Sequence, residues 1–159
     1  MTFALSVHRT TTTDPLARPL FEELAHEYTT RYGSPHDLAT YPAAEFTPPH
    51  GAFLLLLEQG RPVAGGAYRR YDEHTAELKR IWTHSAHRRR GLARRVLTVL
   101  EREAAARGYS RVYLTTGPRQ PEAKGLYLAS GYRPLFDVTA DPESIGPLPF
   151  EKFLENPKP

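Results

Sequence analysis

Cysteine is absent from this sequence of 159 residues. Its absence excludes a disulfide framework and leaves no thiolate to act as a nucleophile. A chain of this length fits one domain over residues 1–159, with a hydrophobic core that needs neither a metal nor a disulfide. The sequence therefore predicts a cytoplasmic location, and no metal site is expected.

Long apolar runs are also lacking. The longest, residues 52–57, is far too short to span a bilayer. The first residues lack the positive segment and the apolar stretch of a secretory signal. The net charge of +3 is too small to indicate a nucleic-acid partner by itself. We therefore expect neither a membrane nor a nucleic-acid partner.

Alternating and helical patterns divide the chain into elements. Strands are predicted at residues 3–7, 52–57, 63–71, 77–83, 111–116, 132–138 and 149–154, and helices at residues 15–33, 92–107 and 121–130. A proline-rich loop occupies residues 34–50. The strand, helix and strand between residues 77 and 116 imply one parallel pair within an α+β sheet.

The most unusual stretch is His87 to Arg95, which holds five arginines in nine residues. It follows a predicted strand and opens a predicted helix, where free backbone N–H groups and the helix dipole attract anions. Gly91 lets the backbone come close to a ligand, and Ala93 keeps the first helical turn narrow. The alternative is a solvated basic helix face, but the position between strand and helix favours a phosphate site.

These residues resemble a known family. Arg88-x-x-Gly91-x-Ala93 is similar to the Gln/Arg-x-x-Gly-x-Gly/Ala signature of the GNAT superfamily of N-acetyltransferases. Two further matches follow in register, the strand Val112-Tyr113-Leu114-Thr115-Thr116 and then Ala123-x-x-Leu126-Tyr127-x-x-x-Gly131-Tyr132. The departures are Ser85, Arg89 and Gln120, where the family often has proline, glycine and asparagine.

The resemblance implies a mixed sheet of about seven strands with a splayed parallel pair, flanked by helices. It also implies acetyl-CoA as acetyl donor, with its pyrophosphate on the backbone of residues 89–93, its pantetheine arm along the strand ending at Thr83, and the thioester between Thr83 and Thr115. The cofactor-binding residues expected on this basis are Ile81, Trp82, Thr83, Arg88, Arg89, Arg90, Gly91, Leu92, Ala93 and Gln120.

Two residues are candidates for proton transfer. Glu77 is the candidate base for the protonated amine, and the alternative is that it only pairs with Lys79 or Arg80. Tyr127 resembles the family's general acid, which protonates the leaving thiolate. The alternative for Tyr127 is ordinary helix packing beside Leu126.

The acceptor is expected between the first helix and the proline-rich loop, near Tyr32, His36, Tyr41 and Phe46. The acidic residues Asp37, Glu45 and Glu73 hint at a cationic acceptor. The predicted activity is acetyl transfer to a primary amine of a small molecule or peptide by direct attack in a ternary complex. The alternatives are a non-catalytic acyl-CoA-binding module and a basic nucleic-acid-binding domain. A homodimer through an edge strand at residues 149–154 is also possible.

Overall fold

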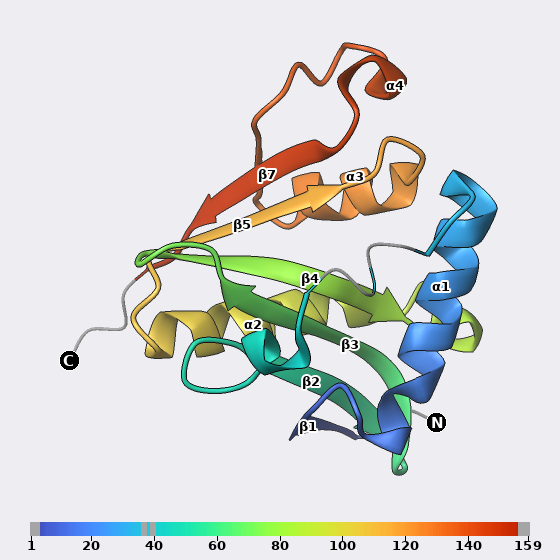
Figure 1. Ribbon diagram of the computed structural model, residues 1–159, viewed down its shortest axis with the longest axis vertical. Helices are drawn as coiled ribbons and strands as arrows, with labels where there is room; N and C mark the ends of the chain where they lie inside the picture. Colours follow the sequence, from blue (N-terminus) through green and yellow to red (C-terminus); the bar gives the residue numbers. More distant parts are fainter. Residues whose placement is uncertain (1–3, 36–37, 39–40, 156–159) are drawn as a thin grey trace.

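The computed structural model describes residues 4–35, 38 and 41–155. Its strands form one mixed sheet in the order β1-β2-β3-β4-β5-β7-β6 (Figure 1). The strands are β1 (Leu5–Thr10), β2 (Ala52–Glu58), β3 (Arg61–Arg70), β4 (Thr75–Thr83), β5 (Arg111–Thr116), β6 (Arg133–Pro134) and β7 (Leu148–Phe153). The helices are α1 (Arg18–Tyr32), α2 (Leu92–Ala106), α3 (Pro121–Ala129) and α4 (Pro142–Ile145).

The sheet is covered on both faces, which explains the continuous apolar run of β2. Leu54 and Leu56 belong to the core cluster that contains the apolar face of α2 and Tyr127 of α3. Phe53 and Leu55 belong to the second cluster, with the buried leucines of α1. A strand buried on both faces reads as an unbroken hydrophobic segment.

The parallel strands β4 and β5 separate along their length. They pair only at Thr75 with Arg111, Ala76 with Val112, and Glu77 with Tyr113. Both strands continue beyond this point, and Figure 1 shows them diverging toward their C-terminal ends, where α1 and α3 lie. The predicted splayed pair is therefore confirmed.

A bulge interrupts the pairing of β3 with β4. The register shifts between Gly65 and Ala67, opposite Arg80, whose φ is +59°. A Cβ atom on Gly66 would lie 2.7 Å from Cδ1 of Ile81, so a larger residue there would have to displace the end of that side chain. A bulge bends the strand that carries it and changes the direction of its side chains.

Two strand predictions differ from the structure in extent. The first strand covers Leu5–Thr10 rather than residues 3–7, and Phe3 lies outside the described residues. The strand expected at residues 132–138 is only Arg133–Pro134. Proline has no N–H for a strand ladder, and Asp137 then accepts hydrogen bonds from both the backbone N–H and the hydroxyl of Thr139, which closes a turn.

The C-terminal region contains a helix that was not predicted. Asp141 accepts a hydrogen bond from the backbone N–H of Glu143, and Pro142 is the first residue of α4. This is the same Asp-Pro start signal that begins the first helical segment at Asp14. The expectation of an edge strand at residues 149–154 is wrong, because β7 lies between β5 and β6.

Candidate functional site

The arginine loop before α2 is shaped as an anion site. Arg89 and Gly91 both have left-handed backbone conformations, with φ values of 64° and 72°. No side chain among the described residues caps the start of α2 at Gly91. The N–H groups of the first helical turn therefore remain available to a ligand, at the positive end of a helix of 15 residues.

A cavity of about 380 Å³ opens beside this loop. We call it the arginine cavity, because Arg88, Arg89 and Arg94 line it. Nine of the ten predicted cofactor residues lie in its wall: Ile81, Trp82, Thr83, Arg88, Arg89, Gly91, Leu92, Ala93 and Gln120. Arg90 is not among them, since its guanidinium forms an ion pair with Glu58. Arg94 was not predicted, although its position in the first turn of α2 could have indicated it.

A glutamate of α1 holds the end of β4 in place. Oε1 of Glu23 accepts hydrogen bonds from the indole N–H of Trp82 and from the backbone N–H of Ser85, both at 2.9 Å. Burial alone would raise the pKa of Glu23, but the bonds from Ser85 and Trp82 hold it below its usual range. Ser85, which replaces the family's frequent proline, is therefore an anchor for the arginine loop. No local pattern predicts this contact, because 62 residues separate the partners.

A second cavity of about 520 Å³ has residues of both splayed strands, β4 and β5, in its wall. We call it the tyrosine cavity, because Tyr28, Tyr32 and Tyr41 line it. Tyr32 and Tyr41 were predicted for this wall. Phe46 is not part of it and instead packs 4.4 Å from the guanidinium of Arg80. The predicted His36 lies outside the described residues.

The two cavities share part of their walls. Ile81, Gln120, Ala123 and Tyr127 line both of them. Tyr127 is 6% exposed, and its ring packs against those of Tyr132 and Phe150. Burial raises the pKa of Tyr127, so its phenol stays protonated at neutral pH. A protonated phenol thus stands where the two cavities meet.

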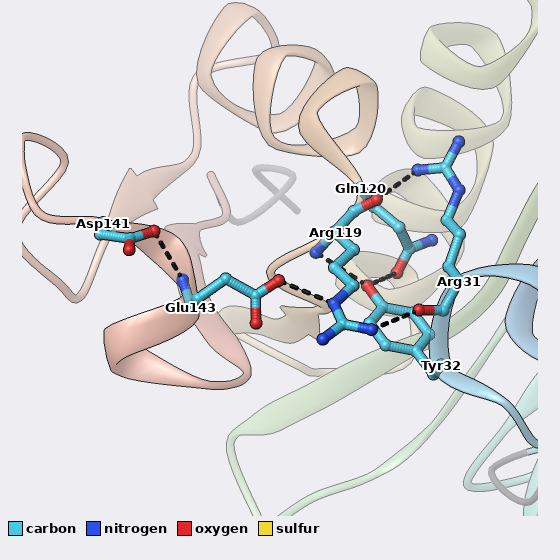
Figure 2. Close-up of polar contacts among 6 residues, drawn as sticks. All are labelled: Arg31, Tyr32, Arg119, Gln120, Asp141 and Glu143. Atoms are coloured by element: carbon cyan, nitrogen blue, oxygen red, sulfur yellow. Dashed lines mark hydrogen bonds and ion pairs between the residues drawn. The ribbon is translucent and has the colours of Figure 1, made fainter.

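Gln120 joins the end of α1 to the β5–α3 turn (Figure 2). Its Oε1 accepts hydrogen bonds from the hydroxyl of Tyr32 and from the backbone N–H of Gly117, each at 3.2 Å. The same hydroxyl accepts from the backbone N–H of Arg119 at 3.0 Å. A Cβ atom on Gly117 would lie 1.9 Å from the Tyr32 hydroxyl, so only glycine admits this contact.

Arg119 extends this network in both directions (Figure 2). Its guanidinium donates to the carbonyl of Arg31 at 2.8 Å and pairs with Glu143 of α4 at 2.7 Å. Arg31 in turn donates to the carbonyl of Arg119 at 2.6 Å. These contacts bring α1, the β5–α3 turn and α4 together at the tyrosine cavity.

Glu77 is paired with two cations, one of which, Lys79, lines the tyrosine cavity. Its carboxylate accepts from Arg69 at 2.8 Å and lies 3.5 Å from Lys79, and the residue is 5% exposed. It is absent from the described residues that line either cavity. The ion pair with Lys79 matches one of the two alternatives for this residue, while its role as base stays a prediction.

Comparison with known proteins identifies the family. The model of the acetyltransferase (GNAT) family matches residues 18–132. The chain belongs to this family. An N-acetyltransferase of Bacillus subtilis named YsnE, itself uncharacterized, is 36% identical over 93 residues, which are 55% of this chain and 62% of YsnE. The chain thus matches less than two thirds of the length of that relative.

Solved structures share the GNAT fold. A protein from Klebsiella pneumoniae, proposed to be an acyl-CoA N-acyltransferase, superposes with a TM-score of 0.74 at 25% identity over 95% of this chain and 98% of its own. A GNAT acetyltransferase from Elizabethkingia anophelis with acetyl-CoA bound superposes with a TM-score of 0.70 at 15% identity, over 94% and 98%. The predicted fold is therefore confirmed.

The GNAT framework explains one departure in the arginine loop. Arg89 replaces a frequent glycine and has a φ of 64°, a conformation that glycine adopts without strain. A left-handed residue other than glycine costs about 1–2 kcal/mol. Its side chain lines the arginine cavity, where a positive charge favours an anionic ligand.

Within residues 4–35, 38 and 41–155, no three His, Asp or Glu side chains are grouped so that they could hold a metal ion. In the same part of the chain, no helix combines the length and apolarity needed to cross a bilayer.

Proposed function

We propose that the chain is an N-acetyltransferase that moves the acetyl group of acetyl-CoA to a primary amine by direct attack in a ternary complex. The observation that carries this proposal is the meeting of the two cavities at Tyr127. One cavity has the arginine loop at its rim. The other, of about 520 Å³, has room for a second substrate. The acetyl-CoA bound to the Elizabethkingia relative supports the choice of donor.

The cofactor lies in the arginine cavity in this proposal. The pyrophosphate contacts the free N–H groups that begin α2, with Arg88, Arg89 and Arg94 beside it. The pantetheine arm follows β4 beyond Glu77, where β5 no longer pairs with the strand. Backbone groups of β4 that face this opening are then free to bind the amides of the arm. Arg90 contributes through its backbone alone, because Glu58 holds its side chain.

The chemical step takes place near Tyr127. The amine nitrogen attacks the thioester carbonyl, the C–N bond forms, and the C–S bond breaks. Tyr127 donates its proton to the leaving sulfur, which would otherwise depart as the thiolate of a thiol whose pKa is about 8.5. Glu77 accepts one proton of the ammonium group through a bridging water, because its carboxylate is not part of a cavity wall. The second proton, which the nitrogen loses as the amide forms, restores the phenol of Tyr127. No cysteine is present for a covalent intermediate.

Two measurements test this function. Acetyl-CoA at 100 times its dissociation constant is expected to stabilise the protein by about 2.7 kcal/mol, seen as a higher melting temperature. Release of free thiol is then measured with acetyl-CoA and a panel of primary amines. An unchanged melting temperature at millimolar acetyl-CoA contradicts cofactor binding. Stabilisation without thiol release for any amine supports the non-catalytic acyl-CoA-binding alternative.

A further inference from the structure

Arg80 is a buried cation in the wall of the tyrosine cavity. It occupies the β4 bulge, is 9% exposed, and lines the cavity next to Ile81. Its guanidinium lies between the rings of Phe46 and Phe21, at 4.4 and 5.3 Å. One nitrogen, Nη2, donates to the carbonyl of Leu38 at 2.9 Å. These contacts fix the guanidinium plane but do not neutralise its charge.

A second nitrogen of this guanidinium, Nη1, has no partner among the described residues. Nη1 of Arg80 is buried and makes no hydrogen bond to a described residue. No described carboxylate forms an ion pair with Arg80, whereas Lys79 pairs with Glu77 and Arg119 with Glu143. An unpaired buried charge is costly, so such a group is expected to acquire an anionic partner.

The acidic residues that suggested a cationic acceptor are placed elsewhere. Glu45 pairs with Arg69 at 2.7 Å, and Glu73 lies in the exposed turn between β3 and β4. Asp37 lies outside the described residues. Glu143 is the acidic residue among those that line the tyrosine cavity, and Arg119 already neutralises it. The described wall therefore carries a net positive charge.

We propose that the acceptor is an amine that also carries a carboxylate, and that Arg80 binds this carboxylate. A planar guanidinium matches a carboxylate with two parallel hydrogen bonds, and Nη1 is the free donor. Arg80 directly precedes Ile81, which lines both cavities, so an anion at Arg80 leaves the amine close to the thioester. This inference rests on the proposed acetyl transfer and names its substrate class.

The test compares amines that differ only in the carboxylate. The probes are L-phenylalanine against L-phenylalaninamide and phenethylamine, and β-alanine against β-alaninamide. With the wild-type protein and acetyl-CoA, we expect kcat/KM of a carboxylate-bearing probe to exceed that of its neutral partner by about 10-fold or more, the usual effect of one hydrogen bond between charged groups. Equal or faster reaction of every neutral partner overturns the inference.

Two variants assign the preference to Arg80. Arg80→Gln is expected to remove it mainly through a higher KM for the carboxylate probe. Arg61 is an exposed residue of the β2–β3 hairpin. Arg61→Gln removes one positive charge outside the cavity, so this variant should keep the preference for the carboxylate probe. A preference that survives in Arg80→Gln overturns the assignment. Should Arg80→Gln fail to fold, the wild-type comparison still decides whether the carboxylate is preferred.

A binding measurement separates this inference from the proposed activity. Each probe is titrated by calorimetry into the wild-type protein saturated with coenzyme A, which has no acetyl group to transfer. Tighter binding of the carboxylate probes without any turnover supports the Arg80 site and contradicts the transferase. Turnover of neutral and carboxylate probes at equal rates supports the transferase and contradicts the Arg80 site.

Discussion

The hydroxyl of Tyr32 donates to Oε1 of Gln120 at 3.2 Å, so the last residue of α1 is tied to the residue that precedes α3. Gln120 lines both cavities, and its oxygen also accepts from the backbone N–H of Gly117. Nε2 of Gln120 makes no hydrogen bond to a described residue, so its N–H groups are free for a ligand. The glutamine thus combines a structural contact with a position at the cavity junction.

This contact predicts a difference between two substitutions. Gln120→Leu removes the acceptor of two hydrogen bonds and should lower the unfolding free energy by about 1–2 kcal/mol, with a higher KM for acceptor amines. Gln120→Asn keeps the amide and restores the family's frequent residue. It should therefore lower the unfolding free energy less and raise KM less than Gln120→Leu does. Thermal melts and steady-state kinetics measure both effects. Equal behaviour of the two variants would show that the amide is not used.

Tyr127→Phe tests the general acid. Removing the hydroxyl should lower kcat by about 10²- to 10⁴-fold and leave the dissociation constant for acetyl-CoA unchanged, because the ring remains. Tyr113→Phe, a tyrosine outside both cavities, is the matched control and should keep full activity. Thiol release and calorimetry with acetyl-CoA report the two quantities. An unchanged kcat in Tyr127→Phe would refute the assignment.

Arg88 and Arg90 are neighbours with different partners. Arg88 lines the arginine cavity, whereas Arg90 pairs with Glu58. Arg88→Gln should weaken acetyl-CoA binding by about 10-fold and reduce its dependence on salt, because a charge-assisted contact to phosphate is lost. Arg90→Gln should change binding less. Titrations at low and high salt test the pair, and a larger loss in Arg90→Gln would reverse the assignment.

Glu77 and Glu45 bind the same guanidinium, which makes them a controlled pair. Both carboxylates accept from Arg69, at 2.8 Å in each case. If Glu77 is the base, Glu77→Gln lowers kcat by about 10²-fold near neutral pH, and Glu45→Gln leaves kcat unchanged. We expect this difference between the two variants, because Glu77 is the proposed base. Similar losses of melting temperature in both variants, with kcat retained, would instead assign Glu77 to the ion pair alone.

Tyr68 and Tyr109 offer a stability test away from the site. The Tyr68 hydroxyl is buried without a partner in the part of the chain that the structure describes, while that of Tyr109 donates to the carbonyl of His50 at 2.7 Å. Tyr68→Phe should therefore raise the unfolding free energy by about 1 kcal/mol, and Tyr109→Phe should lower it by a similar amount. Denaturant melts at neutral pH measure both. A destabilised Tyr68→Phe would mean that the hydroxyl has a partner.

Burial also makes the contribution of Tyr68 to the unfolding free energy depend on pH. It raises the pKa of Tyr68 to about 12, above the value of about 10 in an unfolded chain. The unfolded form loses this proton first, so the contribution to stability is complete below pH 10 and is lost as pH rises toward 12. Tyr68→Phe should flatten this alkaline decline. An identical decline in the variant would assign it to other groups.

Local patterns predicted the elements whose ends carry strong signals. Gly33 ends α1 with a φ of 82°, and the glycine-containing arginine loop opens α2 as expected. The weak predictions were those at the C-terminus, where Pro134 and the turn at Asp137 stop a strand whose composition alone favours extension. Hydrogen bonds of neighbouring polar groups set these boundaries, and the alternation of hydrophobic residues carries no information about such bonds.

The sequence alone determined the order of elements except α4, the glycine-containing arginine loop that opens α2 and the family resemblance, because each depends on residues close together in the chain. Tertiary structure alone decided which arginines face a cavity: Arg88 does, Arg90 is held by Glu58, and Arg80 is buried without a described counterion. The physical reason is that a charge acts through its nearest partners, and these partners come from distant segments. The charge of the tyrosine cavity therefore depends on the packing of β4, α1 and the β5–α3 turn against one another.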